Sequence, residues 1–274
     1  MNDKNYEYLK DQLKYTGFGD GLNDELKENM LKGNFYFNIR HHTKFGNEDS
    51  IAVLYFKKVD ASETVYFNRY HLSLKPEQSM EVTGQTFNIN KENNITLKEA
   101  YNLLNGRAVN KDLKNSEGEK YNAWLQIDFK DMDNQYNYKY KQYHQNYGYD
   151  LGGELTKLPI RELTNSQSRA DIIQSLQKGN LQSVTLKDGY SEQKIFIEAN
   201  PRFKTINVYD SSLKMIAKET LVTKQSINMP AKIDVAIKQS STGQSKPQSM
   251  RTGNKDDGSD PGPPQKTRKK GLSH

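Results

Sequence analysis

The fold class is decided by residues 64–74, which read Thr64-Val-Tyr-Phe-Asn-Arg-Tyr-His-Leu-Ser-Leu74. As a strand, this stretch places Tyr66, Tyr70, Leu72 and Leu74 on one face and Arg69, His71 and Ser73 on the other. Such alternation is typical of an antiparallel sheet with one packed face and one face in water. Residues 35–39, 51–56 and 86–89 are similarly rich in β-branched and aromatic residues, so we predict that they belong to the same sheet.

Two short helices are expected before this sheet. Apolar residues recur at helical spacing over residues 6–13 and again over residues 22–30. Gly17 and Gly33 follow these stripes and are suited to end each helix in a left-handed conformation. Glycines at 17, 19 and 21 look like a phosphate loop, but a nucleotide fingerprint needs a preceding strand. We therefore interpret residues 17–21 as a turn between helices.

The chain beyond residue 93 is predicted to contain two helix–strand–strand–strand units. Thr96-Leu-Lys-Glu99 is a capping box, and it begins a helix with Leu97, Ala100, Tyr101 and Leu104 in its buried stripe. Strands are predicted at 108–113, 121–129 and 136–143. A second helix begins at Asn165 or Ser166, ends at Gly179, and precedes strands at 181–186, 194–199 and 205–209. The expected class is thus α+β, with antiparallel sheets, short helices and an internal repeat.

The predicted domain plan has four parts. Residues 1–93 hold the helical pair and the first sheet, 94–160 the first α-β-β-β unit, and 161–238 the second. Residues 239–274 are rich in Ser, Gly, Gln, Pro and Lys, so we expect a disordered tail.

Net charge is distributed unevenly between the tail and the rest. The chain has 40 Lys and Arg against 34 Asp and Glu, a net charge of +6. The tail holds seven of these basic and three of these acidic residues, which leaves only +2 for residues 1–238. A strong fixed basic patch is therefore not implied for the folded part.

Several classes of chemistry find no support in the 274 residues. With no Cys, the chain has no disulfides, Cys-ligated zinc or thiol nucleophile. The five histidines lack metal-ligand spacing, and Asp128, Asp131 and Asp133 fit neither register of a calcium loop. Nucleophile-elbow and Walker A motifs are also missing. We expect no cofactor, no metal and no enzymatic activity. The alternative in this class is an enzyme whose site is assembled from residues distant in the sequence.

The most suggestive stretch is the tyrosine-rich strand predicted at residues 136–143. It would place Tyr136, Tyr138 and Tyr140 on one face, with Lys139 and Lys141 opposite. Exposed aromatic rings on a sheet stack nucleobases, and nearby lysines neutralise phosphates. The alternative is that the tyrosines pack on a helix while the lysines face water.

The tail ends in a basic cluster formed by Lys266, Arg268, Lys269 and Lys270. Such a cluster binds nucleic acid weakly and with salt dependence, or it is a solubilising terminus.

Five stretches of the chain carry a family resemblance. They are residues 8–19, 94–107 and 121–129, together with the pair 144–149 and 176–184. They resemble an uncharacterised family of Bacteroidetes proteins that is often encoded on conjugative and other mobile elements near topoisomerase genes. The resemblance covers about residues 5–215, and it implies a mobile-element context without supplying any catalytic residue.

The sequence thus leads to a functional hypothesis and a rival. We expect a non-enzymatic accessory protein of a mobile element that binds DNA or a DNA-processing protein through the tyrosine-rich strand and the tail. The rival is a protein–protein interaction scaffold, in which uncovered strand edges pair with a partner chain. The polar N-terminus and the absence of a long apolar run predict a cytoplasmic protein without a membrane role. The oligomeric state is left open.

Overall fold

The computed structural model describes residues 2–59, 63–75, 82–90, 92–188 and 191–217. It confirms an α+β fold with three antiparallel sheets and short helices. The predicted tail at 239–274, including its basic cluster, lies outside these residues. Across the described ranges, no helix is both long and apolar enough to cross a membrane.

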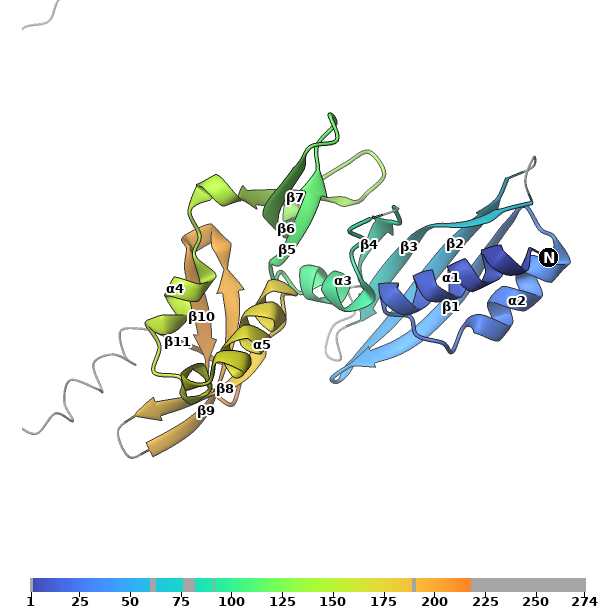
Figure 1. The fold of residues 1–274 in the computed structure, drawn as a ribbon. Helices are drawn as coiled ribbons and strands as arrows, with labels where there is room; N and C mark the ends of the chain where they lie inside the picture. The colour runs from blue at the N-terminus through green and yellow to red at the C-terminus, as the bar shows by residue number, and fades with distance from the viewer. Residues whose placement is uncertain (1, 60–62, 76–81, 91, 189–190, 218–274) are drawn as a thin grey trace, which may run out of the picture. The chain divides into compact units, whose positions relative to one another are not determined.

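The N-terminal sheet is a four-stranded meander with helices on one face (Figure 1). The elements are α1 (Asp3–Thr16), α2 (Asn23–Lys32), β1 (Tyr36–Phe45), β2 (Glu48–Lys58), β3 (Val65–Lys75) and β4 (Thr83–Asn88). Leu9 and Leu13 of α1 and Leu26 of α2 are fully buried in the same core as Leu54 and Leu72 of the sheet. The predicted pair of helices before an antiparallel sheet is therefore confirmed.

Local signals explain why α1 ends where it does and how it meets the sheet. Gly17 has φ of 96°, in the left-handed region, and the N–H of Phe18 donates to the carbonyl of Leu13. Asn5 is buried in α1, and its side-chain amide donates to and accepts from the backbone of Val65 at 2.9 and 2.8 Å. Residues 17–21 thus form the predicted connection between helices.

The predicted position of Tyr66 on the buried face of β3 is wrong. Tyr55 pairs with Arg69 but Phe56 pairs with Phe67, so Asn68 is an extra residue in a β-bulge. A bulge shifts the alternation by one residue. Phe67 is consequently buried in the core, whereas Tyr66, which we predicted on the buried face, is 51% exposed.

The capping box begins α3 (Leu97–Leu104) as predicted. The backbone N–H of Thr96 donates to Glu99 at 2.9 Å, and Lys111 contacts the same carboxylate at 3.1 Å. Leu103 is fully buried, whereas Tyr101, predicted in the buried stripe, is only partly buried. The reason is that the Tyr101 ring stacks on Phe45 at the rim of the first core, with 4.2 Å between ring centroids.

A three-stranded sheet contributes to both hydrophobic cores. It comprises β5 (Val109–Lys114), β6 (Lys120–Met132) and β7 (Tyr138–His144) in that order. Leu125 and Ile127 of β6 belong to the first core, while Trp124 belongs to the second. The predicted hairpin and third strand of this unit are confirmed.

The second unit repeats the same order of elements. It is preceded by a 3₁₀ turn (Gln145–Tyr147), α4 (Leu151–Thr156) and a second 3₁₀ turn (Arg161–Thr164). It consists of helix α5 and a four-stranded sheet whose strands lie in the order β11-β10-β9-β8. The bounds are α5 (Ser166–Gln177), β8 (Gln182–Asp188), β9 (Ser191–Asn200), a 3₁₀ turn (Pro201–Phe203), β10 (Thr205–Tyr209) and β11 (Met215–Ile216). The helix–strand–strand–strand order is thus confirmed twice, while the domain boundaries at 93/94 and 160/161 remain predictions.

The two helices of these units are joined at their C-terminal ends. Asn102 donates to the carbonyl of Lys178 at 2.7 Å, and Arg107 donates to the carbonyl of Gly179 at 3.0 Å. Gly179 has φ of 75°, and a Cβ there would lie 2.8 Å from the carbonyl oxygen of Ala108. The Arg107 guanidinium therefore caps the C-terminal end of α5, while its backbone N–H donates to the Asn102 carbonyl of its own helix.

Candidate nucleic-acid interface

The three tyrosines predicted to form a stacking platform do not share one exposed face. Tyr136 lies in the turn before β7, with φ of 60° and 85% exposure. Its predicted place in the strand is wrong, because Asp133 accepts from the backbone N–H groups of Gln135 and Asn137 and holds this segment as a turn. Tyr136 is thus separated from the two tyrosines of β7.

Tyr138 and Tyr140 pack against the first core. The Tyr138 ring meets Phe129 edge-to-face at 5.0 Å between centroids, and both tyrosines are partly buried. Burial raises the pKa of Tyr140 to about 12. These two rings therefore have a packing role, as in the alternative interpretation of the tyrosine-rich strand.

Lys139 and Lys141 are both neutralised within their own hairpin. Lys139 lies 2.9 Å from Asp131, and Lys141 lies 2.7 Å from Asp128. The hydrogen bond from Lys141 is the main reason that the pKa of Asp128 is lowered. Two of the three aspartates that do not fit a calcium loop thus pair with the lysines. The described ranges contain no group of three side chains that could hold a metal ion.

A different surface collects cations and aromatic rings: the face of the N-terminal sheet that points away from α1, α2 and α3. We call it the open face. Five rows of register-paired residues cross it, namely Tyr36/Lys57/Tyr66, Asn38/Tyr55/Arg69/Asn88, Arg40/Val53/His71/Thr86, His42/Ile51/Ser73/Gly84 and Lys44/Asp49/Lys75. Four of these rows carry at least one Lys or Arg, and Asp49 is the single carboxylate among them.

Three of these five cations have no acidic partner among the described residues. Lys44 contacts Asp49 at 3.3 Å. Among the residues whose positions are described, no carboxylate lies within 4.0 Å of Arg40, Lys57 or Arg69, whereas Lys139 and Lys141 are paired. The charge on the open face is therefore available to a ligand, in contrast to the charge on β7.

Tyrosine rings lie between these cations. The Lys57 ammonium lies 5.6 Å from the ring centroid of Tyr36, and the Arg69 guanidinium lies 5.1 Å from that of Tyr55. Tyr36 is 70% exposed, and the bulge at Asn68 brings Tyr66 to the same face. The bulge is what places Tyr66 and Arg69 together, because without it they would occupy opposite faces.

The helical side of the same sheet has the opposite charge balance. Residues 1–33, which hold α1 and α2, contain seven Asp and Glu but only five Lys. The open face carries five Lys and Arg against one Asp. An anionic ligand would therefore be attracted to one side of this sheet and not to the other.

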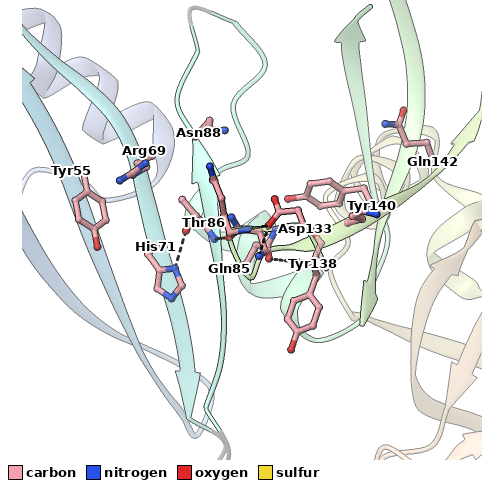
Figure 2. Close-up of a pocket in the computed structure, with 13 residues that line it drawn as sticks. Tyr55, Arg69, His71, Gln85, Thr86, Asn88, Asp133, Tyr138, Tyr140 and Gln142 are labelled. Carbon is pink, nitrogen blue, oxygen red and sulfur yellow. Dashed lines mark hydrogen bonds between the residues drawn. The ribbon is translucent and has the colours of Figure 1, made fainter. Parts of the chain in front are cut away.

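A hollow of about 720 Å³ opens where the open face reaches the β4 edge (Figure 2). Tyr55, Arg69 and His71 line it on the sheet side, and Asp133 and Gln135 line it on the hairpin side. We call it the edge hollow. Figure 2 shows Arg69 and His71 on the same strand, with the His71 ring hydrogen-bonded to Thr86 of β4.

The histidines are dispersed, as their spacing predicts. His41 and His42 point to opposite faces of β1, where His41 meets Phe18 edge-to-face at 5.5 Å. His71 contacts the hydroxyl of Thr86 at 3.0 Å, and His144 stacks on Tyr121. Burial lowers the pKa of both His41 and His71, with the charge of His42 as a second cause for His41.

The open face had a partial signal in the sequence. The alternation in residues 64–74 already assigned Arg69 and His71 to a wet face. The same alternation in β1, over Tyr36, Asn38 and Arg40, would have extended this face to a second strand. The sequence does not show which lysines form ion pairs, because ion pairing depends on the register between strands.

The chain matches no protein-family model, no curated protein and no solved structure. The resemblance to a family of mobile-element proteins therefore remains a prediction.

Proposed function

We propose that the chain binds single-stranded nucleic acid through the open face of its N-terminal sheet. The observation that carries this proposal is the set of Arg40, Lys57 and Arg69, which have no carboxylate within 4.0 Å in the described part of the chain. Exposed tyrosines lie between these cations. Together they supply the phosphate contacts and the stacking surfaces that single strands require.

The shape of the face favours a single strand over a duplex. The major groove of B-DNA, about 12 Å wide, admits a helix or a two-stranded ribbon. Four strands spaced by about 4.8 Å form a broader surface than this groove admits. Unstacked bases can instead lie on the rings of Tyr36 and Tyr66 and on the guanidinium plane of Arg69.

The number of phosphate contacts predicts how steeply the binding affinity falls with salt concentration. Three phosphate contacts, from Arg40, Lys57 and Arg69, would give a slope of log affinity against log salt of roughly −2 for a single strand. Each contact that is removed would reduce this slope by about 0.7.

The test is a pair of charge-matched double variants. Lys57→Glu with Arg69→Glu reverses two cations on the open face, and Lys14→Glu with Lys27→Glu makes the same change in α1 and α2. Binding of a labelled strand of about 15 nucleotides is followed by fluorescence anisotropy at two salt concentrations. We expect the open-face variant to weaken binding at least about tenfold and to flatten the slope, while the helix variant stays within about twofold.

Equal weakening by both variants would contradict a role for the open face, since it would mean that net charge alone controls binding. Failure of the wild-type chain to bind any single strand would overturn the proposal itself. In that case the scaffold function would become the leading one. Its site would be the edge of β1, which pairs only with β2 among the described strands.

The accessory role on a mobile element is part of the proposal and rests on the resemblance alone. The basic residues at 266–270 would add further phosphate contacts. Deleting residues 239–274 is expected to weaken binding and flatten its salt dependence. Unchanged binding after this deletion would remove the tail from the proposal but would leave the open face in it.

A further inference from the structure

The edge hollow has a chemistry different from that of the open face it adjoins. Its walls come from β3 and β4 on one side and from the turn before β7 on the other. At about 720 Å³ it falls within the range of pockets that hold small molecules. Tyr55, Arg69 and Asn88 belong both to this hollow and to one row of the open face. A strand lying on that row would pass the mouth of the hollow.

We propose that the edge hollow receives one unstacked base of the bound strand and gives the protein a base preference. The inference rests on the proposed function, because the open face must first hold the strand. It goes further because it assigns the selection of a base to the edge hollow, whereas the cations in the rows of the open face bind the phosphates.

The hollow is held open by bonds between the two walls. Gln85 is 2% exposed, and its amide accepts from the backbone N–H of Tyr138 and donates to the carbonyl of the same residue, at 2.8 and 3.0 Å. The N–H of Thr86 donates to the side chain of Asn137 at 3.0 Å. Since these contacts fix the hairpin turn against β4, a base would enter a preformed site.

Charge distinguishes a base from a phosphate as the occupant. The hairpin wall carries the carboxylate of Asp133, and its one cation, Lys139, is paired with Asp131. A phosphate would be repelled by Asp133, whereas the exocyclic amino group of a base would be attracted to it. The cation on the sheet wall, Arg69, lies over Tyr55 and is placed to contact the backbone of the strand outside.

Two side-chain amides supply the hydrogen-bonding groups that read a base. Asn88 and Gln135 line the hollow from opposite walls, and neither side chain makes a hydrogen bond to another described residue. A side-chain amide donates and accepts side by side, and this pattern matches the amino group and ring nitrogen of adenine. Adenine is therefore the base that we expect the hollow to prefer.

Gly84 leaves room for the ring of His71, which lines the hollow. A Cβ at this position would lie 2.6 Å from Nε2 of His71. The His71 ring therefore lies against the backbone of β4, where its Nδ1 contacts the Thr86 hydroxyl. A side chain at residue 84 would displace this ring from its place in the lining of the hollow.

The experiment compares affinities for oligo-dA, oligo-dC and oligo-dT strands of equal length in the full chain. We expect the wild type to bind oligo-dA about tenfold more tightly. Asn88→Ala combined with Gln135→Ala should reduce this preference to about twofold, with an unchanged salt slope for oligo-dT. The matched control is Asn38→Ala, which removes an exposed amide from the same row of the open face on β1, three strands from Asn88, and should keep the preference.

Equal affinity of the wild type for all three strands would overturn the assignment of base selection to the hollow while leaving the proposed function intact. A preference that survives the double variant would overturn it too, since the base would be read elsewhere. If the wild type binds no strand at all, the proposed function fails and the inference fails with it.

Discussion

The wet faces of the first and last sheets contain similar residue types but differ in what those residues contact. On the last sheet, Glu198 accepts hydrogen bonds from Asn207 and Tyr209 at 2.7 and 2.6 Å, and Asn200 donates to Asn207 at 2.8 Å. Its polar groups satisfy one another. On the open face, by contrast, three cations lack an acidic partner within the described residues.

This difference teaches that exposure alone does not identify a binding surface. A polar residue whose hydrogen bonds are made within the sheet stabilises the fold, and its removal leaves partners unsatisfied. A charged residue with no partner contributes little to stability, so its presence calls for another explanation.

The largest effect is expected from the aromatic rings of the open face. Tyr36→Ala combined with Tyr66→Ala should weaken binding of a single strand by about 2–4 kcal/mol, because stacking contributes about 1–3 kcal/mol per base. Titration of a labelled strand measures this loss. Tyr15→Ala, which removes a ring of α1 that is 79% exposed, is the control and should bind like the wild type.

The next effect should appear on the last sheet, in stability and not in binding. Glu198→Ala leaves the hydroxyl of Tyr209 and the amide of Asn207 without their acceptor, so we expect a loss of about 1–3 kcal/mol in the free energy of unfolding. Arg69→Ala should change it by less than about 0.5 kcal/mol. Urea denaturation of both variants measures the difference. An equal loss of unfolding free energy in the two variants would contradict the proposed difference between the two faces.

The smallest effect concerns pH. Burial lowers the pKa of His41 and His71, so the unfolded chain takes up protons near the ordinary histidine pKa, about 6.5, while the folded chain does not. Stability should therefore rise with pH through this window and fall as the pH drops below about 6.5. His41→Gln with His71→Gln should flatten the pH dependence of the urea midpoint. An unaltered profile would mean that other groups cause it.

The elements of the fold could largely be predicted because their signals are local. Gly17 ends α1 and the Thr96–Glu99 capping box begins α3, each through contacts within a few residues. The bulge at Asn68 could not be predicted, since it arises from pairing between β2 and β3. That one residue changed the face assigned to Tyr66.

The candidate site was harder to predict for a related reason. The dense alternation of Tyr and Lys after residue 135 drew the functional hypothesis to β7, where the lysines are paired and two of the tyrosines are partly buried. The cations of the open face are spread over β1, β2 and β3. Only strand register shows that they form one surface.

The most direct test compares these two surfaces in one assay. Lys57→Gln with Arg69→Gln and Lys139→Gln with Lys141→Gln each remove two positive charges from the full chain. The affinity of each variant for a single-stranded oligonucleotide is measured at one salt concentration. We predict at least about a tenfold loss for the first variant and less than about a twofold loss for the second. The opposite order would contradict the account and return the interface to β7.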